Sequence, residues 1–158
     1  MSREVFRNFF RTWARDITSL CGLPLNVFVF VFLMSLNKIV IAVEFLLAIV
    51  LSLVLSLVIR YFYFRARPGN GKIHYDSALK RLDDSSFPSI HASKAMIMAV
   101  ILSQGLPLLT TVLIWYIALI ICGTRIYLKK HYPTDVLGGV ILGLFVSYLV
   151  IYFVGLFV

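Results

Sequence analysis

The stretch TRIYLKKHYPTD, residues 124–135, lies between two long apolar runs and decides how the chain is arranged. It places Arg125, His131 and Asp135 between segments that carry almost no charge. Polar groups set between membrane spans are costly and usually functional. A histidine near a carboxylate suggests a nucleophile or base, and the planar fork of an arginine suits phosphate oxygens. The stretch therefore predicts a site for an anion at the end of a membrane bundle.

The composition predicts a membrane protein. The chain has 158 residues, of which 61% are hydrophobic and only 14% are charged. A soluble domain of this size would expose too much apolar surface, so we expect an all-α, polytopic membrane helix bundle. The length suits a single integral-membrane domain over residues 1–158. The N-terminus is basic but mixes charges with aromatics, so we expect no cleavable signal peptide and a first span that acts as an uncleaved signal.

The apolar runs predict about five spans. Polar or turn-forming residues punctuate them at Asn37-Lys38, at 60–87 and at Gln104–Pro107. A short helix is expected near residues 76–82, in a polar segment that caps the site. Gly139 and Gly143 are four residues apart, as close helix packing requires. The expected spans are residues 17–36, 39–59, 89–103, 108–124 and 135–157.

Residues 3–16 predict an amphipathic helix. Aromatic and aliphatic side chains recur at helical spacing, while Arg3, Arg7, Arg11 and Arg15 recur every four residues. An arginine stripe opposite an aromatic stripe suits a helix that lies in the headgroup layer. The alternative is a face that packs on the protein's own spans.

Two further segments also place polar or basic residues at the end of an apolar run. One reads Arg60-x6-Arg67-Pro68, and the other reads Pro88-Ser89-Ile90-His91. Together with Thr124-Arg125-x5-His131-x3-Asp135, they resemble the type-2 phosphatidate phosphatase superfamily of membrane lipid phosphatases. That family's pattern is Lys-x6-Arg-Pro, then Pro-Ser-Gly-His, then Ser-Arg-x5-His-x3-Asp. The order and internal spacings match over residues 60–135.

The chain departs from this pattern at three positions. Arg60 keeps the charge of the usual lysine, and Thr124 keeps the hydroxyl of the usual serine. Ile90 replaces glycine, and a β-branched residue disfavours a positive φ. We therefore expect Ile90 to offer its amide from an ordinary helical or extended conformation. The form Phe-Pro-Ser-x-His-Ala looks like the polyprenyl-diphosphate phosphatase branch of the family.

The resemblance implies a role for each matching residue. His131 would attack phosphorus to give a phosphohistidine, Asp135 would accept the other ring N–H of His131, and His91 would protonate the leaving oxygen. Several groups would hold the phosphoryl oxygens, aided by the positive end of the third span: Arg60, Arg67, Arg125, Ser89 and the amide of Ile90. Lys94 would contact a second phosphate or extend to the membrane surface. The arginines supply positive charge and no metal-ligand cluster is evident, so we expect neither metal nor cofactor.

The remaining notable residues have plainer interpretations. Arg65, Lys129 and Lys130 are expected to contact headgroups or the surface, and His74 to lie solvated in a loop. Glu44 is expected to be structural or interfacial, because it lies at the end away from the motifs. Thr134 looks like the N-cap of the last span. Cys21 and Cys122 are read as packing residues.

The function that the resemblance implies is a lipid phosphatase. The expected substrate is a polyprenyl diphosphate of undecaprenyl or dolichyl type, cut to the monophosphate by water while its tail stays in the bilayer. Phosphatidylglycerophosphate and phosphatidate are alternatives within the same chemistry. A non-catalytic subunit that binds or transports anionic lipid is an alternative of another class. A vanadate haloperoxidase shares the motifs but not the membrane character.

The net charge and the positions of the basic residues indicate the kind of partner and the location of the protein. The net charge is +8, and the basic residues gather near the motifs, which favours lipid phosphate over nucleic acid. The expected location is the cell membrane. The positive-inside rule alone would place the motif-bearing ends in the cytoplasm. The resemblance implies the outer face, and phosphate binding accounts for many of these charges, so we expect an extracytoplasmic site. The sequence says nothing of the oligomeric state.

Overall fold

A computed structural model describes residues 3–19, 22–68 and 77–157, and every regular element in these ranges is an α-helix. The expected all-α fold is therefore confirmed. A helix lies at the place of each predicted element, with ends that differ by up to six residues. The helices are α1 (Arg3–Ser19), α2 (Leu23–Ser35), α3 (Ile39–Phe62), α4 (Ala78–Asp84), α5 (Ile90–Leu102), α6 (Leu108–Tyr127) and α7 (Pro133–Gly155).

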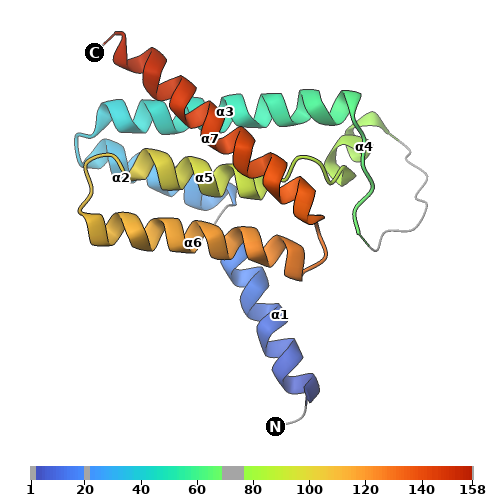
Figure 1. Cartoon of the computed structure of the whole chain (residues 1–158). Helices are drawn as coiled ribbons and strands as arrows, with labels where there is room; N and C mark the ends of the chain where they lie inside the picture. The colour runs from blue at the N-terminus through green and yellow to red at the C-terminus, as the bar shows by residue number, and fades with distance from the viewer. Residues whose placement is uncertain (1–2, 20–21, 69–76, 158) are drawn as a thin grey trace.

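Helix α5 occupies the centre of the bundle. It packs against α3, α6 and α7, whereas α2 packs against α3 (Figure 1). Its apolar residues, including Ala95, Met96, Ile97 and Ile101, are almost fully buried. Apolar side chains on the outer faces of α3, α6 and α7 remain exposed, as expected where lipid is the solvent.

Two glycines let α7 approach α5 closely. A Cβ added at Gly139 would collide with the carbonyl oxygen of Ser89, and one added at Gly143 would lie 2.5 Å from the carbonyl oxygen of Ser93. Both obstacles are backbone atoms, one in the residue before α5 and one within α5, and neither can rotate away. The close packing predicted from the spacing of these glycines is confirmed.

Within the described residues, three helices are long and apolar enough to cross a membrane: α3, α6 and α7. The other two expected spans correspond to α2 and α5, which are apolar but have 13 residues each. At 1.5 Å per residue, 13 residues extend roughly 20 Å, less than the thickness of the hydrocarbon layer. The first expected span does not begin at Ile17, because α1 continues to Ser19 and α2 starts at Leu23.

Helix α1 contacts α6 with its C-terminal part, while its N-terminal part projects away from the bundle (Figure 1). Ala14 is buried at this contact, while Phe9 and Trp13 remain 63% and 45% exposed. The alternative expected for α1, a face packed on the protein's own helices, therefore holds for part of it. The exposed aromatics are compatible with an interfacial position, which stays a prediction.

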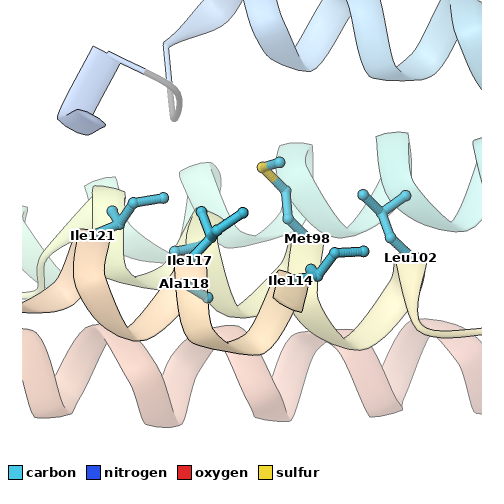
Figure 2. A pocket seen from close by; sticks show the side chains of 7 residues that line it. Met98, Leu102, Ile114, Ile117, Ala118 and Ile121 are labelled. Atoms are coloured by element: carbon cyan, nitrogen blue, oxygen red, sulfur yellow. The ribbon is translucent and has the colours of Figure 1, made fainter. Parts of the chain in front are cut away.

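An apolar crevice of about 80 Å³ separates α5 from α6. Figure 2 shows Met98 and Leu102 of α5 beside Ile114, Ile117 and Ile121 of α6. All seven residues that line it are apolar, so their side chains provide no hydrogen-bond donor or positive charge that could bind an anion.

Candidate active site

The polar motifs meet because four helices have ends at the same side of the bundle. Helices α3 and α6 end there, with Arg60 and Arg125 in their last turns. Helices α5 and α7 begin there, and the Ser89 N–H donates to the Asp135 carbonyl at 3.0 Å. Cations suit the negative ends of α3 and α6, and anions suit the positive ends of α5 and α7. Residues far apart in the sequence thus form one candidate anion site.

His131 is buried between α6 and α7, with 3% of its surface exposed. Its Nδ1 lies 2.7 Å from the carbonyl oxygen of Ser86. A carbonyl can only accept, so Nδ1 carries the proton and Nε2 keeps its lone pair. Burial, followed by the positive charge of Arg125, lowers the pKa of His131 to about 3, although the bond to Ser86 raises it. His131 is therefore neutral near pH 7.

Asp135 does not hold His131 directly, and the expected hydrogen bond between them is wrong. The distance from His131 Nδ1 to Asp135 Oδ2 is 4.0 Å, too long for a hydrogen bond. Asp135 Oδ2 accepts instead from the Tyr132 backbone N–H at 2.8 Å, and Oδ1 accepts from Arg65 at 2.7 Å. Both oxygens of this fully buried carboxylate therefore have other partners.

The start of α7 corrects two further expectations. The N-cap is Tyr132, not Thr134, because Pro133 already occupies the first helical position and Asp135 reaches back to the Tyr132 N–H. Arg65 is not a simple surface contact. Its guanidinium donates to Thr134 Oγ1 at 2.6 Å and to Asp135, and it lies 4.1 Å from the centre of the Tyr132 ring.

Arg60 and Arg67 are held by backbone carbonyls, those at the end of α4 and that of Pro88. Arg60 donates to Leu82 O at 3.0 Å and to Pro88 O at 3.1 Å, and Arg67 donates to Asp83 O at 2.6 Å. The last carbonyls of any helix lack partners within it. Here the two arginines satisfy them, so α4 orients both cations. Among the residues described, the Arg60 Nε atom is buried with no hydrogen-bond partner.

The second motif forms the start of α5. Ser89 is its N-cap and is fully buried, and its Oγ accepts from the Ala92 N–H at 3.4 Å. Ile90 is the first helical residue and has no positive φ, as expected. His91 and Lys94 follow on the same helix and are half-buried. A contact of Lys94 with a second phosphate stays a prediction.

The arginines of the first and third motifs lie near His131. Arg125 is 6% exposed and Arg60 is 4% exposed. Arg125, Arg67 and Arg60 all act on the charge of His131, which shows that the structure brings the predicted phosphate-binding arginines to the predicted nucleophile. The arrangement can hold a tetrahedral anion against a neutral imidazole.

Sequence reasoning missed two groups that bond to His131 and Asp135. Ser86 acts through its backbone carbonyl, which no side-chain motif can reveal. Arg65 stands two positions before Arg67, in the variable part of the first motif. A second arginine beside the Arg-Pro pair was the available signal, but it was indistinguishable from a headgroup contact.

The other expected residues lie elsewhere. Glu44 is buried in α3 and accepts from Gln104 Nε2 at 2.6 Å, which fits the structural interpretation. Cys122 is a free, buried thiol, as expected for a packing residue. His74 and Cys21 fall outside the described residues. Within the described ranges, no three His, Cys, Asp or Glu side chains group as metal ligands.

Comparison with known proteins identifies the family to which the chain belongs. The sequence profile of the PAP2 superfamily matches residues 41–157. The chain belongs to the PAP2 superfamily. Over 102 residues it is 29% identical to "Putative undecaprenyl-diphosphatase YbjG" of Escherichia coli K12, a match that covers 65% of this chain. The chain spans about half the length of that relative (51%).

Two solved structures share the fold of this PAP2 protein. LpxE of Aquifex aeolicus superposes with a TM-score of 0.77 at 25% identity and covers 91% of this chain and 86% of its own. A PAP2-type phosphatidylglycerolphosphate phosphatase of Bacillus subtilis gives 0.70 at 28% identity, with coverage of 92% and 76%. Both support an all-helical membrane bundle as the frame of the site.

Proposed function

We propose that this PAP2 protein is a metal-independent membrane lipid phosphatase that hydrolyses a polyprenyl diphosphate to the monophosphate. The observation that carries the proposal is His131: a buried, neutral imidazole with Nδ1–H on a carbonyl and Nε2 free, among three arginines. Such a nitrogen is a competent nucleophile near pH 7.

The mechanism follows from the positions of these groups. Arg60, Arg67 and Arg125 hold the oxygens of the terminal phosphate, with help from the amides at the start of α5. His131 Nε2 attacks phosphorus, a P–N bond forms, and the P–O bond to the lipid monophosphate breaks. His91 donates a proton to the leaving oxygen. Water then attacks phosphorus while His91 takes a proton from it, the P–N bond breaks, and inorganic phosphate leaves with His131 neutral again.

The arginines of the site supply enough positive charge for this mechanism to work without a metal ion. Fixed guanidinium groups can stabilise the charge of a phosphoryl transition state, as bound cations do in other enzymes. The carbonyls of α4 hold Arg60 and Arg67 in place before the substrate arrives. Little reorganisation is then needed when charge develops.

The substrate has a route to the site. An open cavity of about 570 Å³ is lined by Tyr63, Arg65, Phe87 and Thr134, directly beside the start of α7. Its walls combine aromatic rings with cationic and hydroxyl groups, which suits the junction of a lipid tail and a phosphate. We propose that the lipid enters there while its tail remains in the bilayer.

The choice of a polyprenyl diphosphate rests on the Phe-Pro-Ser-x-His-Ala motif and on the likeness to the E. coli relative. Phosphatidylglycerophosphate is the second candidate, because the B. subtilis phosphatase named for it shares the fold. A phosphate-release assay in detergent with undecaprenyl diphosphate, phosphatidylglycerophosphate and phosphatidate tests the choice. Preferential turnover of the diphosphate supports it. Release from none of the three would favour a binding or transport subunit instead.

We further propose that the site faces the outside of the cell. Lys130 is exposed in the loop between α6 and α7, next to the site. A Lys130→Cys variant without the two native cysteines provides one thiol there. Labelling of intact cells by a membrane-impermeant reagent supports the outer face, whereas labelling only after lysis contradicts it.

A further inference from the structure

Phe87 lies between two residues whose backbone carbonyls hold groups of the site. The carbonyl of Ser86 accepts from His131 Nδ1 at 2.7 Å. The carbonyl of Pro88 accepts from Arg60 at 3.1 Å. Consecutive Cα atoms are about 3.8 Å apart, so Phe87 stands beside both the proposed nucleophile and one phosphate-binding arginine. Its side chain takes no part in the proposed mechanism.

The ring of Phe87 rests on α7 at a position that has no side chain. A Cβ added at Gly138 would lie 2.6 Å from Cε2 and 2.9 Å from Cζ of this ring. Real Cβ atoms essentially never come this close to another heavy atom, so glycine is what leaves room for the ring. Both atoms belong to the far edge of the ring. A methyl group there would therefore displace the ring before it moved the backbone of Ser86 or Pro88.

Tyr63 packs edge-to-face on the same ring. It is the residue that follows α3, and the two ring centres are 5.5 Å apart at an angle of 85°. Such aromatic pairs are favourable beyond the area that they bury. Neither ring is fully covered, because Tyr63 is 56% exposed and Phe87 is half-buried. Tyr63 and Gly138 thus hold Phe87 in place and leave part of its surface uncovered.

The two rings form the apolar wall of the open cavity beside the site. Tyr63 and Phe87 line this cavity of about 570 Å³ together with Arg65 and Thr134. Its volume lies in the usual range of small-molecule sites, roughly 300–1,000 Å³. The polar wall is tied together, since Arg65 donates to Thr134 Oγ1 at 2.6 Å. The cavity therefore offers an apolar surface directly next to the groups proposed to bind phosphate.

We propose that Phe87 is a specificity-determining residue, whose ring contacts the first isoprene units of the lipid tail. A tail whose phosphate is held by Arg60 and attacked by His131 begins within reach of this ring. Contact between an apolar chain and an aromatic face removes both from water. The inference deepens the proposed function and rests on it for the choice of a prenyl tail.

The dependence of phosphate release on tail length tests the contact. The full chain in detergent is assayed with methyl diphosphate, which has no prenyl tail, and with dimethylallyl and geranyl diphosphates, which carry one and two isoprene units. In the wild type, kcat/KM should rise from the methyl to the prenyl substrates. In Phe87→Ala the prenyl preference should fall by roughly tenfold or more, the usual effect of lost contacts in an apolar pocket. A general disturbance of the site would lower kcat/KM for all three substrates by the same factor.

Further variants act on the same ring or serve as controls. Gly138→Ala keeps the Phe87 side chain but displaces its ring, so it should lower the prenyl preference severalfold. Phe87→Leu keeps an apolar side chain and should retain part of the preference. Tyr61→Leu is the matched control, because Tyr61 is 66% exposed at the same end of α3 and does not line the cavity. It should leave the preference unchanged.

Two results would overturn the inference. One is a prenyl preference in Phe87→Ala and Gly138→Ala equal to that of the wild type. The other is a loss of the same size in Tyr61→Leu. Gly138→Ala decides the question even if Phe87→Ala does not fold.

Photocrosslinking separates the inference from the proposed function. A prenyl diphosphate with a diazirine in its first isoprene unit is irradiated with the His131→Ala variant, which cannot form the phosphohistidine. Label in the tryptic fragments 82–94 and 61–65, which contain Phe87 and Tyr63, supports the inference, and label confined to other fragments overturns it. If these two fragments are labelled but the wild type releases no phosphate from any substrate, the proposed function fails and the inference stands. If the wild type turns over and the label lies elsewhere, the inference fails and the proposed function stands.

Discussion

Replacement of Gly143 by alanine tests how closely α5 and α7 must approach. The added Cβ would lie 2.5 Å from the Ser93 carbonyl oxygen, 2.9 Å from Met96 Cβ and 3.0 Å from Ser93 Cα. Ordinary contacts begin near 3.4 Å, so α7 must move away from α5 by about 0.9 Å. Two of the three obstacles are backbone atoms, which leaves no cheap adjustment.

The magnitude follows from two opposing terms. Overpacking against backbone costs about 3 kcal/mol, the upper part of its usual range. The better helix propensity of alanine returns about 1 kcal/mol. The net loss of about 2 kcal/mol should lower the melting temperature by roughly 4–8 °C for a chain of this size. Gly123 is the control, because its Cβ would meet nothing within 4 Å, so Gly123→Ala should keep or raise the melting temperature.

Tryptophan fluorescence during heating of the detergent-solubilised protein, at one fixed scan rate, measures both variants. Activity gives a second measure. The Ser89 N–H to Asp135 carbonyl bond joins the same two helices at the site, so their separation should also lower phosphate release at temperatures where the variant is folded. A Gly143→Ala protein as stable as Gly123→Ala would refute the close-packing argument.

Three further predictions concern the chemistry. His131→Ala should abolish phosphate release while the melting temperature stays within a few degrees, and activity near wild type would remove His131 as nucleophile. Because the pKa of His131 is lowered to about 3, its reactive neutral form is lost only as pH falls through that value, so the acid-side fall of kcat/KM should lie near pH 3 and not near the ordinary histidine pKa of about 6.5. Excess chelator should leave turnover unchanged and vanadate should inhibit it; chelator inhibition reversed by magnesium or zinc would contradict the proposed role of the arginines.

Much of the fold could be read from local properties of the chain. Apolar runs of span length predict helices in a membrane, and polar turns between them set approximate ends. The antiparallel order of consecutive spans then puts Arg60, Ser89, Arg125 and Asp135 at one side of the bundle. The spacing of Gly139 and Gly143 predicted close packing of the last helix, since four residues return to the same face of a helix.

The hydrogen bonds inside the site could not be read in this way. The four-residue spacing of His131 and Asp135 predicted their proximity, but proximity did not decide which acceptor the imidazole uses. The imidazole bonds to a backbone carbonyl 45 residues before His131, and the carboxylate bonds to Arg65, 70 residues before Asp135. The directions of these groups depend on how α4 and the loops pack against the ends of α3, α5 and α7. The sequence thus determined which chemical groups gather at the end of the bundle. Only the tertiary structure decided how they pair, because a buried carboxylate bonds to the donors that packing brings within about 3 Å.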